Sequence, residues 1–286
     1  MAIAAARARR MFRTAATAFI AFAGLAGLQG FTPPLPPVRA QARDAAAPQS
    51  AKIWIDRRHD IEEYLRNAEV VKIDAIGVGV TSPRRAYLAP GGPFDSFTWK
   101  PIKPGRYQGF LESYKSEIAA YELDKFLKID MIPPAVERNV NGAVGAAVMW
   151  ASPVKSFKQL GGVPSPPAAL RDAWTRQIIK AKMIDNLIAN IDPNLGNWLV
   201  DPAWNIILID HSRAFTDTQR MTHEMSNIDA ALWDRMKALD DQQLRTVLGS
   251  WVSADAISSL LRRRDKMQTI VDKLVKKRGA APVPLR

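Results

Sequence analysis

The spacing of hydrophobic residues changes along the chain, and the first half has the pattern of a strand-rich segment. Between Asp56 and Ala68 apolar residues recur three or four positions apart, which predicts a short helix. Val70 to Lys103 carries runs of Val, Ile, Thr, Phe and Trp broken by Gly and Pro, which predicts two or three strands joined by turns. A helix is predicted over Tyr114 to Leu127, and a buried strand over the small apolar residues Ala143 to Trp150.

The second half of the chain has a mostly helical pattern. After a loop rich in Gly and Pro at 155–169, apolar residues from Asp172 onward keep helical spacing over about five turns. Two short apolar runs, Trp198 to Val200 and Ile206 to Ile209, predict a hairpin. Further helices are predicted near 227–238, 241–250 and 254–278. A strand-rich half followed by a helix-rich half is typical of an α+β fold with two lobes.

The first 42 residues have the composition of a targeting segment. Residues 1–13 hold four Arg and no acid, an uncharged Ala- and Gly-rich run follows, and Ala40-Gln41-Ala42 resembles a cleavage site. Arg9 and Arg10 resemble a twin-arginine export motif. We therefore expect a signal peptide and an exported chain, periplasmic or secreted; a disordered basic leader or a wrongly chosen start is the alternative. Because the apolar run is shorter than the roughly 20 residues of a membrane span, we expect no stable transmembrane span after cleavage.

Composition and charge narrow the chemistry. The chain has no Cys, which excludes disulfides, thiolate zinc sites and a cysteine nucleophile, and its three His leave little for a histidine-rich metal site. The formal net charge of +12 falls to +7 without residues 1–42, which hold five Arg and no acid. Several of the remaining basic residues lie in the last predicted helix, where a solvated face is the more typical role than nucleic-acid binding. We therefore do not expect nucleic acid as a partner.

These patterns divide the chain into five segments. We expect a signal peptide at 1–42, a linker at 43–55, an N-lobe at 56–153, a C-lobe at 154–278 and a tail at 279–286. The linker is expected because small and polar residues fill most of positions 43–52.

Three polar residues of the second half form a set suited to metal-assisted phosphoryl transfer. Asp192 and Asn197 lie on one loop after the long predicted helix, and Asp210 ends the strand that pairs back toward that loop. Two carboxylates and one amide oxygen are hard ligands and proton acceptors, as transfer assisted by Mg²⁺ requires. One Asp can orient an attacking hydroxyl, while the Asn and the second Asp hold metal at the phosphates.

The spacing of these residues resembles the catalytic loop and metal-binding hairpin of the protein-kinase-like superfamily. Asn197 follows Asp192 by five positions, and Asp210 follows Asn197 by thirteen. Ile209 to Phe215 resembles the hairpin of the atypical branches, namely the phosphatidylinositol 3-/4-kinases and the secretory-pathway casein-kinase-like proteins. The resemblance implies a two-lobed kinase-like fold, with Asp192 as the catalytic residue and with Asn197 and Asp210 as metal ligands.

The resemblance also implies a phosphate-binding region in the first half. Gly77, Gly79 and Thr81 belong to a segment that resembles a glycine-rich phosphate loop, in which backbone amides approach phosphate oxygens. Phe97-Thr98-Trp99-Lys100-Pro101 resembles the strand that carries the ATP lysine. We assign this lysine to Lys100 rather than Lys103, because alternation places Lys100 opposite the neighbouring apolar side chains.

A helix and a hinge complete the resemblance. Lys115 to Asp124 resembles the αC helix of the secretory-pathway kinases, which makes Glu117 the partner of the lysine. Met149 and Trp150 correspond to the hinge beside the adenine. The resemblance thus implies an enzyme that binds ATP with Mg²⁺ or Mn²⁺ and transfers the γ-phosphate to a hydroxyl acceptor: a protein, a sugar or a lipid head group.

One departure from the kinase pattern keeps alternatives open. The atypical kinases usually have Arg-His after the catalytic Asp, whereas this chain has Pro193-Asn194. The departure favours a pseudokinase or nucleotide-binding scaffold without transfer activity, while the intact set of two Asp and one Asn favours an enzyme. A nucleotidyl transferase would use the same residues. His211 cannot be assumed to replace the missing His, and Arg213 is expected to brace the hairpin or a loop.

Overall fold

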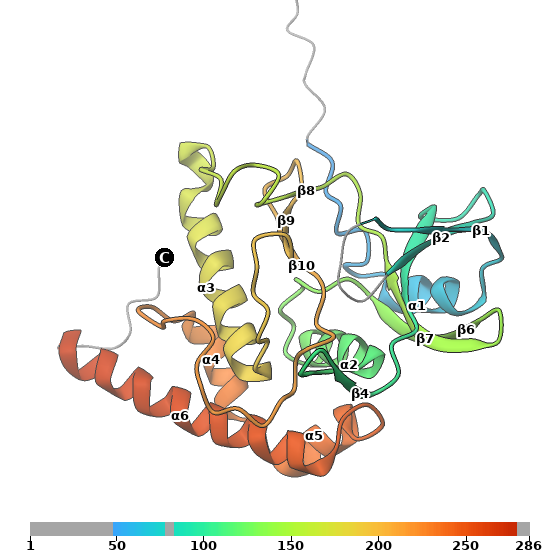
Figure 1. Cartoon of the computed structure of the whole chain (residues 1–286). Helices are drawn as coiled ribbons and strands as arrows, with labels where there is room; N and C mark the ends of the chain where they lie inside the picture. Colours follow the sequence, from blue (N-terminus) through green and yellow to red (C-terminus); the bar gives the residue numbers. More distant parts are fainter. Residues whose placement is uncertain (1–47, 78–82, 279–286) are drawn as a thin grey trace, which may run out of the picture. The chain divides into compact units, whose positions relative to one another are not determined.

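The computed structural model of the chain describes residues 48–77 and 83–278 (Figure 1). These residues belong to one compact unit, Ala46–Arg286. The predicted signal peptide and tail lie outside the described residues, as do Gly79 and Thr81 of the predicted phosphate loop. Within the described ranges, none of the helices combines the length and the apolar character that a membrane span needs.

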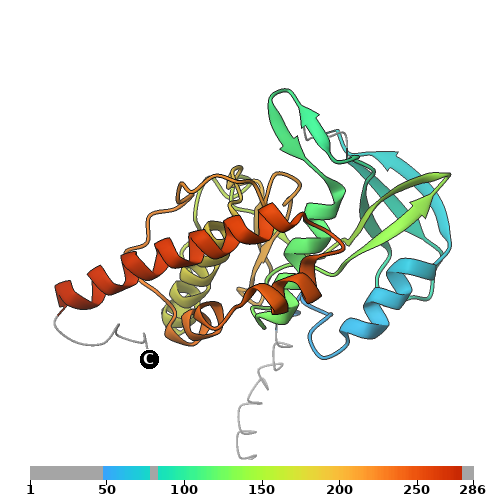
Figure 2. The same ribbon diagram turned by 90° about the horizontal axis from the view of Figure 1, so that it is seen from below.

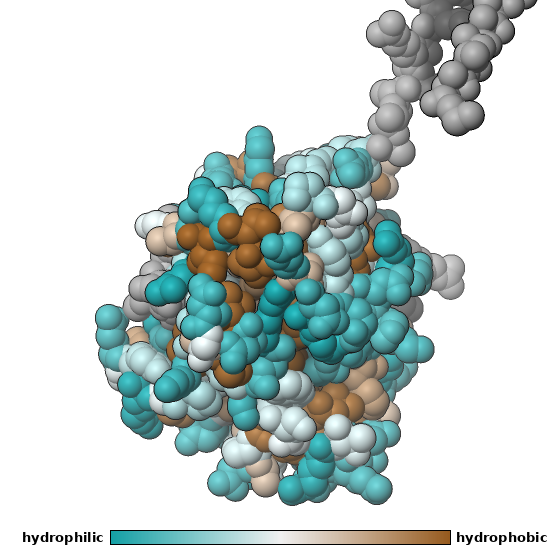
Figure 3. Space-filling model, turned by 90° about the vertical axis from the view of Figure 1, so that its right-hand side faces the viewer, coloured by the Kyte–Doolittle hydropathy of each residue, from teal (hydrophilic) through white to brown (hydrophobic). Residues whose placement is uncertain are grey.

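A five-stranded antiparallel sheet forms the first part of the fold. Its strands are hydrogen-bonded in the order β1 (Val70–Ala75), β2 (Arg84–Leu88), β3 (Ser96–Lys100), β7 (Ala143–Met149) and β6 (Ala135–Val140). The edge strand β1 carries a charged pair, Lys72 and Asp74, whose Nζ and Oδ2 atoms lie 2.7 Å apart. Charges on an edge strand oppose pairing with other chains. On the face shown in Figure 3, apolar residues lie in separate patches among polar ones.

The two faces of this sheet are covered by different helices. Successive side chains of a strand point to opposite faces. Helix α1 (Arg58–Asn67) packs in the cluster that contains Trp99 of β3, whereas α2 (Tyr114–Phe126) packs in the cluster that contains Val148 of β7. Because Lys100 follows Trp99 directly, its side chain points to the face that α2 covers.

Helices and a small sheet form the second part. The predicted hairpin is present as β9 (Trp198–Val200) and β10 (Ile206–Leu208). The strand β8 (Lys155–Ser156), which pairs with β9, lies in the segment 155–169 that the sequence predicts as a loop. The helical elements are the 3₁₀ turn η1 (Ala168–Leu170), α3 (Arg171–Ile188), α4 (Ala230–Lys237), α5 (Asp241–Leu248) and α6 (Ala254–Arg278). Helix α6 contacts α3, α4 and α5, and Figure 2 shows its length along this part. One buried cluster joins α2 to these helices, so α2 connects the two parts.

A short hairpin between β3 and α2 is not predicted by the sequence pattern. It consists of β4 (Gly105–Tyr107) and β5 (Phe110–Glu112), and Figure 2 shows it extending from the beginning of α2. Strands of three residues are too short for a clear alternation of apolar and polar positions. The turn residues Gln108 and Gly109 have φ angles of 47° and 87°, which is the left-handed region that tight hairpin turns use.

The described end of the expected linker is packed on the fold. Ala51 and Trp54 are buried in the cluster that also contains α1. The backbone N–H of Ala51 donates to Oδ2 of Asp201 at 2.9 Å. The sequence predicts a linker there because the preceding residues are small and polar. The large apolar side chain of Trp54 nevertheless packs into the fold, since its burial is favourable whatever the composition of the residues beside it.

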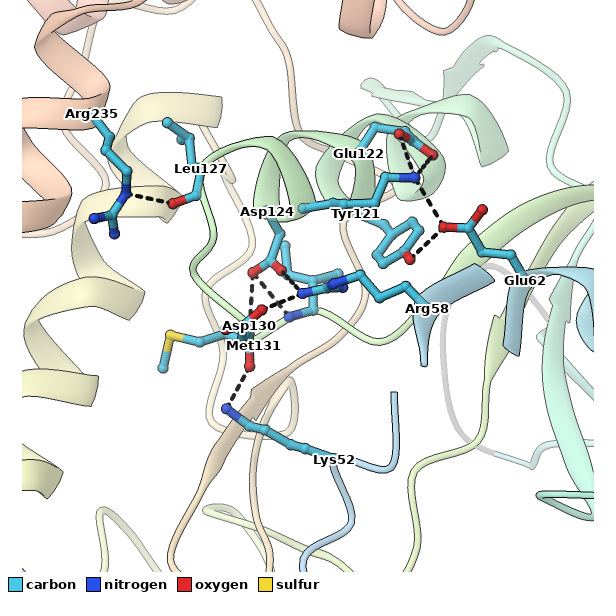
Figure 4. A network of polar contacts seen from close by, with 12 residues as sticks. Lys52, Arg58, Glu62, Tyr121, Glu122, Asp124, Leu127, Asp130, Met131 and Arg235 are labelled. Atoms are coloured by element: carbon cyan, nitrogen blue, oxygen red, sulfur yellow. Dashed lines mark hydrogen bonds and ion pairs between the residues drawn. The ribbon is translucent and has the colours of Figure 1, made fainter. Parts of the chain in front are cut away.

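Charged side chains fix the end of α2 to the segment before the sheet (Figure 4). Asp124 is fully buried and accepts hydrogen bonds from two backbone N–H groups at 2.9 and 3.2 Å. Arg58 contacts both Asp124 and Asp130, and Nζ of Lys52 donates to the carbonyl of Asp130 at 2.6 Å. Burial raises the pKa of Asp124 to about 6 and lowers the pKa of Lys52 to about 8. Burial of the charged forms of Asp124 and Lys52 therefore costs free energy of desolvation, and their polar contacts partly offset this cost.

Replacing Asp124 by Asn should remove a pH dependence of stability. Folded Asp124 keeps its proton up to about pH 6, whereas the unfolded residue releases it near its ordinary pKa of 3.8, so ionisation favours unfolding between these values. We expect the stability of Asp124→Asn relative to wild type to rise from pH 4 to pH 6, by at most about 3 kcal/mol, and then to stay level up to pH 7.

Urea unfolding of the two proteins across this range measures the difference. Asp234→Asn, at an exposed position on α4, is the matched control and should show no such rise. A difference between Asp124→Asn and wild type that stays constant from pH 4 to pH 7 would show that Asp124 has an ordinary pKa.

Candidate functional site

A cavity of about 810 Å³ is bordered by the five-stranded sheet, α2 and the β9–β10 region. It is lined by seven of the predicted site residues: Lys100, Glu117, Met149, Trp150, Asp192, Asn197 and Asp210. Gly77 is described but is not among the lining residues, although its neighbour Ile76 is. Residues from distant parts of the sequence thus converge on one concave surface, as in sites that bind small molecules.

The amine of Lys100 lies between two carboxylates. Its Nζ is 2.6 Å from Oε1 of Glu117 and 2.6 Å from Oδ1 of Asp210. Burial by itself lowers the pKa of Lys100, but the two carboxylates outweigh it and raise that pKa above its ordinary value. Burial likewise raises the pKa of Asp210, and the charge of Lys100 reverses this shift to a lowered value. Lys100 and Asp210 are therefore both charged at neutral pH.

Local structure explains how these three side chains meet. Glu117 lies in the first turn of α2, where the side chain of Ser113 caps the helix by accepting from the N–H of Lys115 at 3.0 Å. The backbone N–H of Ser113 also donates to the carbonyl of Ser212, two residues after Asp210, at 2.9 Å. The beginning of α2 is thereby tied directly to the segment that carries Asp210. Lys103, the alternative lysine, is exposed and is not among the lining residues.

Asp192 is held at its backbone and at its side chain. Its N–H donates to Oδ1 of Asn190 at 3.3 Å, and its carbonyl accepts from Nδ2 of Asn197 at 3.1 Å. Its carboxylate accepts from Nδ2 of Asn194 at 3.0 Å and from Nη1 of Arg213 at 3.3 Å. The carboxylate nevertheless lines the cavity and is partly exposed, so it is fixed in place and accessible to a substrate.

Asn197 and Asp210 are suited to hold part of a metal coordination shell. The N–H of Ile209 donates to the carbonyl of Asn197 at 3.0 Å, so Asn197, just before β9, and Asp210, just after β10, lie at the same end of these paired strands. Since Nδ2 of Asn197 is directed at Asp192, Oδ1 is the atom of this amide that can bind a cation. Among the described residues no group of three or more His, Asp or Glu is arranged to hold an ion. A small protein donor set fits Mg²⁺ or Mn²⁺, which complete their coordination with water and phosphate oxygens.

The charged side chains at the cavity form two separate groups of ion pairs. Lys100 pairs with Glu117 and Asp210, and Arg213 pairs with Glu112 and Asp192. Each group holds two carboxylates and one basic side chain, and Lys158 adds a further basic side chain to the cavity lining.

Arg213 links Asp192 to the β4–β5 hairpin, in line with the expected bracing role. Its Nε and Nη2 atoms lie 2.8 and 2.7 Å from Oε1 of buried Glu112. Its guanidinium lies over the ring of Phe110, 4.4 Å from the ring centre. Sequence reasoning did not identify Glu112, because it lies on the unpredicted hairpin, nor Lys158, which lines the cavity from an irregular loop with no periodic signal.

Two further sequence expectations concern His211 and the hinge. His211 is buried, is not among the lining residues, and has a pKa lowered by burial, so it does not supply a charged imidazole to the cavity. Trp150 is partly exposed, and the guanidinium of Arg85 lies over its ring at 4.2 Å. The backbone N–H of Trp150 bonds to the carbonyl of Ser96 at 3.1 Å, which fixes the end of β7 against β3.

Comparisons with known proteins support the fold. No protein-family model matches the sequence, and no curated protein matches it. Among solved structures, hydra Fam20 with sugar superimposes with a TM-score of 0.59 at 17% identity, over 76% of this chain and 88% of that one. A Golgi casein kinase gives 0.58 at 13% identity over 78% of each chain, and a Golgi casein kinase with Mn/ADP bound gives 0.58 at 12% over 77% and 76%. The chain therefore has an α+β fold of the atypical protein-kinase-like type, as its motifs predicted.

Proposed function

We propose that this chain is an ATP-dependent phosphotransferase that uses Mg²⁺ or Mn²⁺ and a hydroxyl acceptor. The observation that carries the proposal is the position of the Lys100 amine, between Glu117 and Asp210 and in one cavity with Asp192. A buried lysine paired with a helix carboxylate is the arrangement that holds the α- and β-phosphates in kinases. The kinase-like fold, and a neighbour with Mn/ADP bound, support the choice of nucleotide and metal.

The residues of the cavity would have separate roles in phosphoryl transfer. Lys100 would bind the nucleotide phosphates, and Glu117 would hold that lysine in place. Asn197 and Asp210 would hold the metal, which when bound neutralises charge on the phosphates. The acceptor oxygen would form a bond to the γ-phosphorus while the bond between that phosphorus and the β,γ-bridging oxygen breaks. ADP would then be the leaving group, and the proton of the acceptor hydroxyl would pass to Asp192.

The replacement of the usual Arg-His by Pro193-Asn194 is compatible with this chemistry. Asn194 donates to one oxygen of Asp192, and Arg213 brings a positive charge to the other. The guanidinium of Arg213 lines the cavity next to the proposed base, where it would face the transferred phosphoryl group. Transfer in such sites relies chiefly on positioning and charge, which these contacts supply.

The acceptor and the location of the chain complete the proposal. The acceptor is a hydroxyl of a protein, a sugar or a lipid head group; one neighbour was solved with a sugar and others are casein kinases. We further propose export through the leader at 1–42, on the basis of its basic start, apolar run and Ala-Gln-Ala sequence. Mass spectrometry of the periplasmic and secreted fractions tests export by locating the mature N-terminus.

One prediction of the proposed function concerns nucleotide binding. ATP with Mn²⁺ should raise the melting temperature of the purified chain, because a ligand of the folded state stabilises it by about 2.7 kcal/mol at one hundred times its dissociation constant. Asp210→Asn keeps the size of the side chain but removes its charge, so the metal-dependent part of the shift should disappear. An undiminished metal-dependent shift in Asp210→Asn would place the metal elsewhere.

Another prediction of the proposed function concerns turnover. Asp192→Ala should bind ATP and Mn²⁺ like the wild type but transfer phosphate at least about 100-fold more slowly, since it lacks the group that receives the hydroxyl proton. Transfer from labelled ATP to mixed protein, sugar and lipid acceptors measures the rate. Asp234→Ala on the exposed face of α4 is the control and should keep full activity. Equal rates for Asp192→Ala and wild type would contradict the assignment.

A further inference from the structure

A group of buried polar residues lies outside the cavity, at the start of the loop 189–197 that carries Asp192 and is called the catalytic loop below. Asp185, Asn186 and Asn190 are at most 2% exposed, and none of them is among the residues that line the cavity. A buried carboxylate is costly unless other groups pair with it. The contacts of Asp185 therefore indicate what this group of residues does.

Asp185 connects a histidine to the backbone of the catalytic residue. Its Oδ2 lies 2.9 Å from Nε2 of His223, and its Oδ1 accepts from Nδ2 of Asn190 at 3.0 Å. The other end of the Asn190 amide, Oδ1, accepts from the N–H of Asp192 at 3.3 Å. The contacts thus run without a gap from His223 through Asp185 and Asn190 to Asp192.

His223 is fixed to this region by its backbone as well. Its N–H donates to Oδ1 of Asn186 at 2.8 Å, and its carbonyl accepts from Nδ2 of the same amide at 3.0 Å. Its ring lies edge-on to Trp198, with 5.7 Å between ring centres. His223 belongs to the irregular segment 216–229, which connects the Asp210 hairpin to α4. His223 therefore attaches the segment 216–229 to the end of α3, which precedes the catalytic loop, and to Trp198, which follows it.

We propose that His223 is a positioning residue that holds Asp192 in its productive place through Asp185 and Asn190. The proposal rests on the proposed function, because it concerns the residue assigned to receive the proton. Asn190 can hold the N–H of Asp192 only while its amide keeps one orientation, and Asp185 sets that orientation. Asp185 in turn is held by His223, so a displaced segment 216–229 would release the catalytic loop.

Substitution of His223 tests this coupling. His223→Phe keeps the ring against Trp198 but removes the nitrogen that contacts Asp185, while His223→Gln keeps a hydrogen-bonding group at a similar reach. His59→Phe is the matched control, since His59 is exposed on α1. Two readouts are needed: hydrogen exchange of the backbone at 189–197, and steady-state kinetics with ATP.

We expect His223→Phe to speed exchange at 189–197 and to lower kcat at least about tenfold, with the KM for ATP within about twofold of wild type. His223→Gln should restore most of both properties, and His59→Phe should change neither. Should His223→Phe not fold, Asp185→Asn tests the same link and should also speed exchange at 189–197.

A purely structural role predicts a different result. If exchange rises only at 216–229 while 189–197 and kcat stay as in wild type, the coupling is overturned. A wild-type chain with no turnover on any acceptor would instead overturn the proposed function, and the exchange at 189–197 would still decide whether His223 holds the catalytic loop.

Discussion

The Lys100 amine brings together three elements that are far apart in the sequence. Lys100 lies on β3, its partner Glu117 lies in the first turn of α2, and its second partner Asp210 follows β10. Each of these charges would be costly in the interior alone, and together they satisfy one another. The interaction requires the sheet, α2 and the β9–β10 hairpin to keep fixed relative positions. Much of the remaining structure holds these three elements so that the Lys100 amine stays between its two carboxylates.

That support is built from ordinary packing and capping. Strand alternation directs Lys100 to the face that α2 covers, and the Ser113 cap sets where α2 begins. The far end of α2 is anchored by buried Asp124 and the charged groups around it, at a cost in desolvation that a purely apolar contact would avoid. Arg213 contacts the carboxylate of Asp192, and Asp185 holds the amide of Asn190 that accepts from the N–H of Asp192. Several groups thus hold Asp192 in place, and the proposed phosphoryl transfer would depend on such positioning.

The amino-acid sequence is sufficient to predict which residues of the candidate site lie near one another where this depends on local spacing. Asp192, Asn197 and Asp210 lie within one loop and one hairpin, so their separation along the chain already limits their separation in space. Lys100 was distinguished from Lys103 by alternation alone, and the helices and most strands follow from hydrophobic periodicity. The likeness to the kinase fold rested on the order of these motifs, and the structural neighbours confirm it.

Other features depend on contacts that no local pattern contains. The pair of Glu112 and Arg213 joins residues 101 positions apart, and Glu112 lies on a hairpin too short to be seen in the sequence. The contact between Asp185 and His223 spans 38 positions and enters an irregular segment. Burial of Trp54 likewise depends on a cluster to which α1 and several strands of the five-stranded sheet contribute. Such contacts follow from tertiary packing, which single-sequence periodicity does not record.

A crystal structure of the chain with Mn²⁺ and a non-hydrolysable ATP analogue tests the central claim most directly. We expect an anomalous peak for Mn²⁺ beside Asp210 and Asn197, with the α- and β-phosphates at Lys100 and the adenine near Met149 and Trp150. An analogue bound away from Lys100, or a cavity that stays empty at saturating analogue and Mn²⁺, would contradict it.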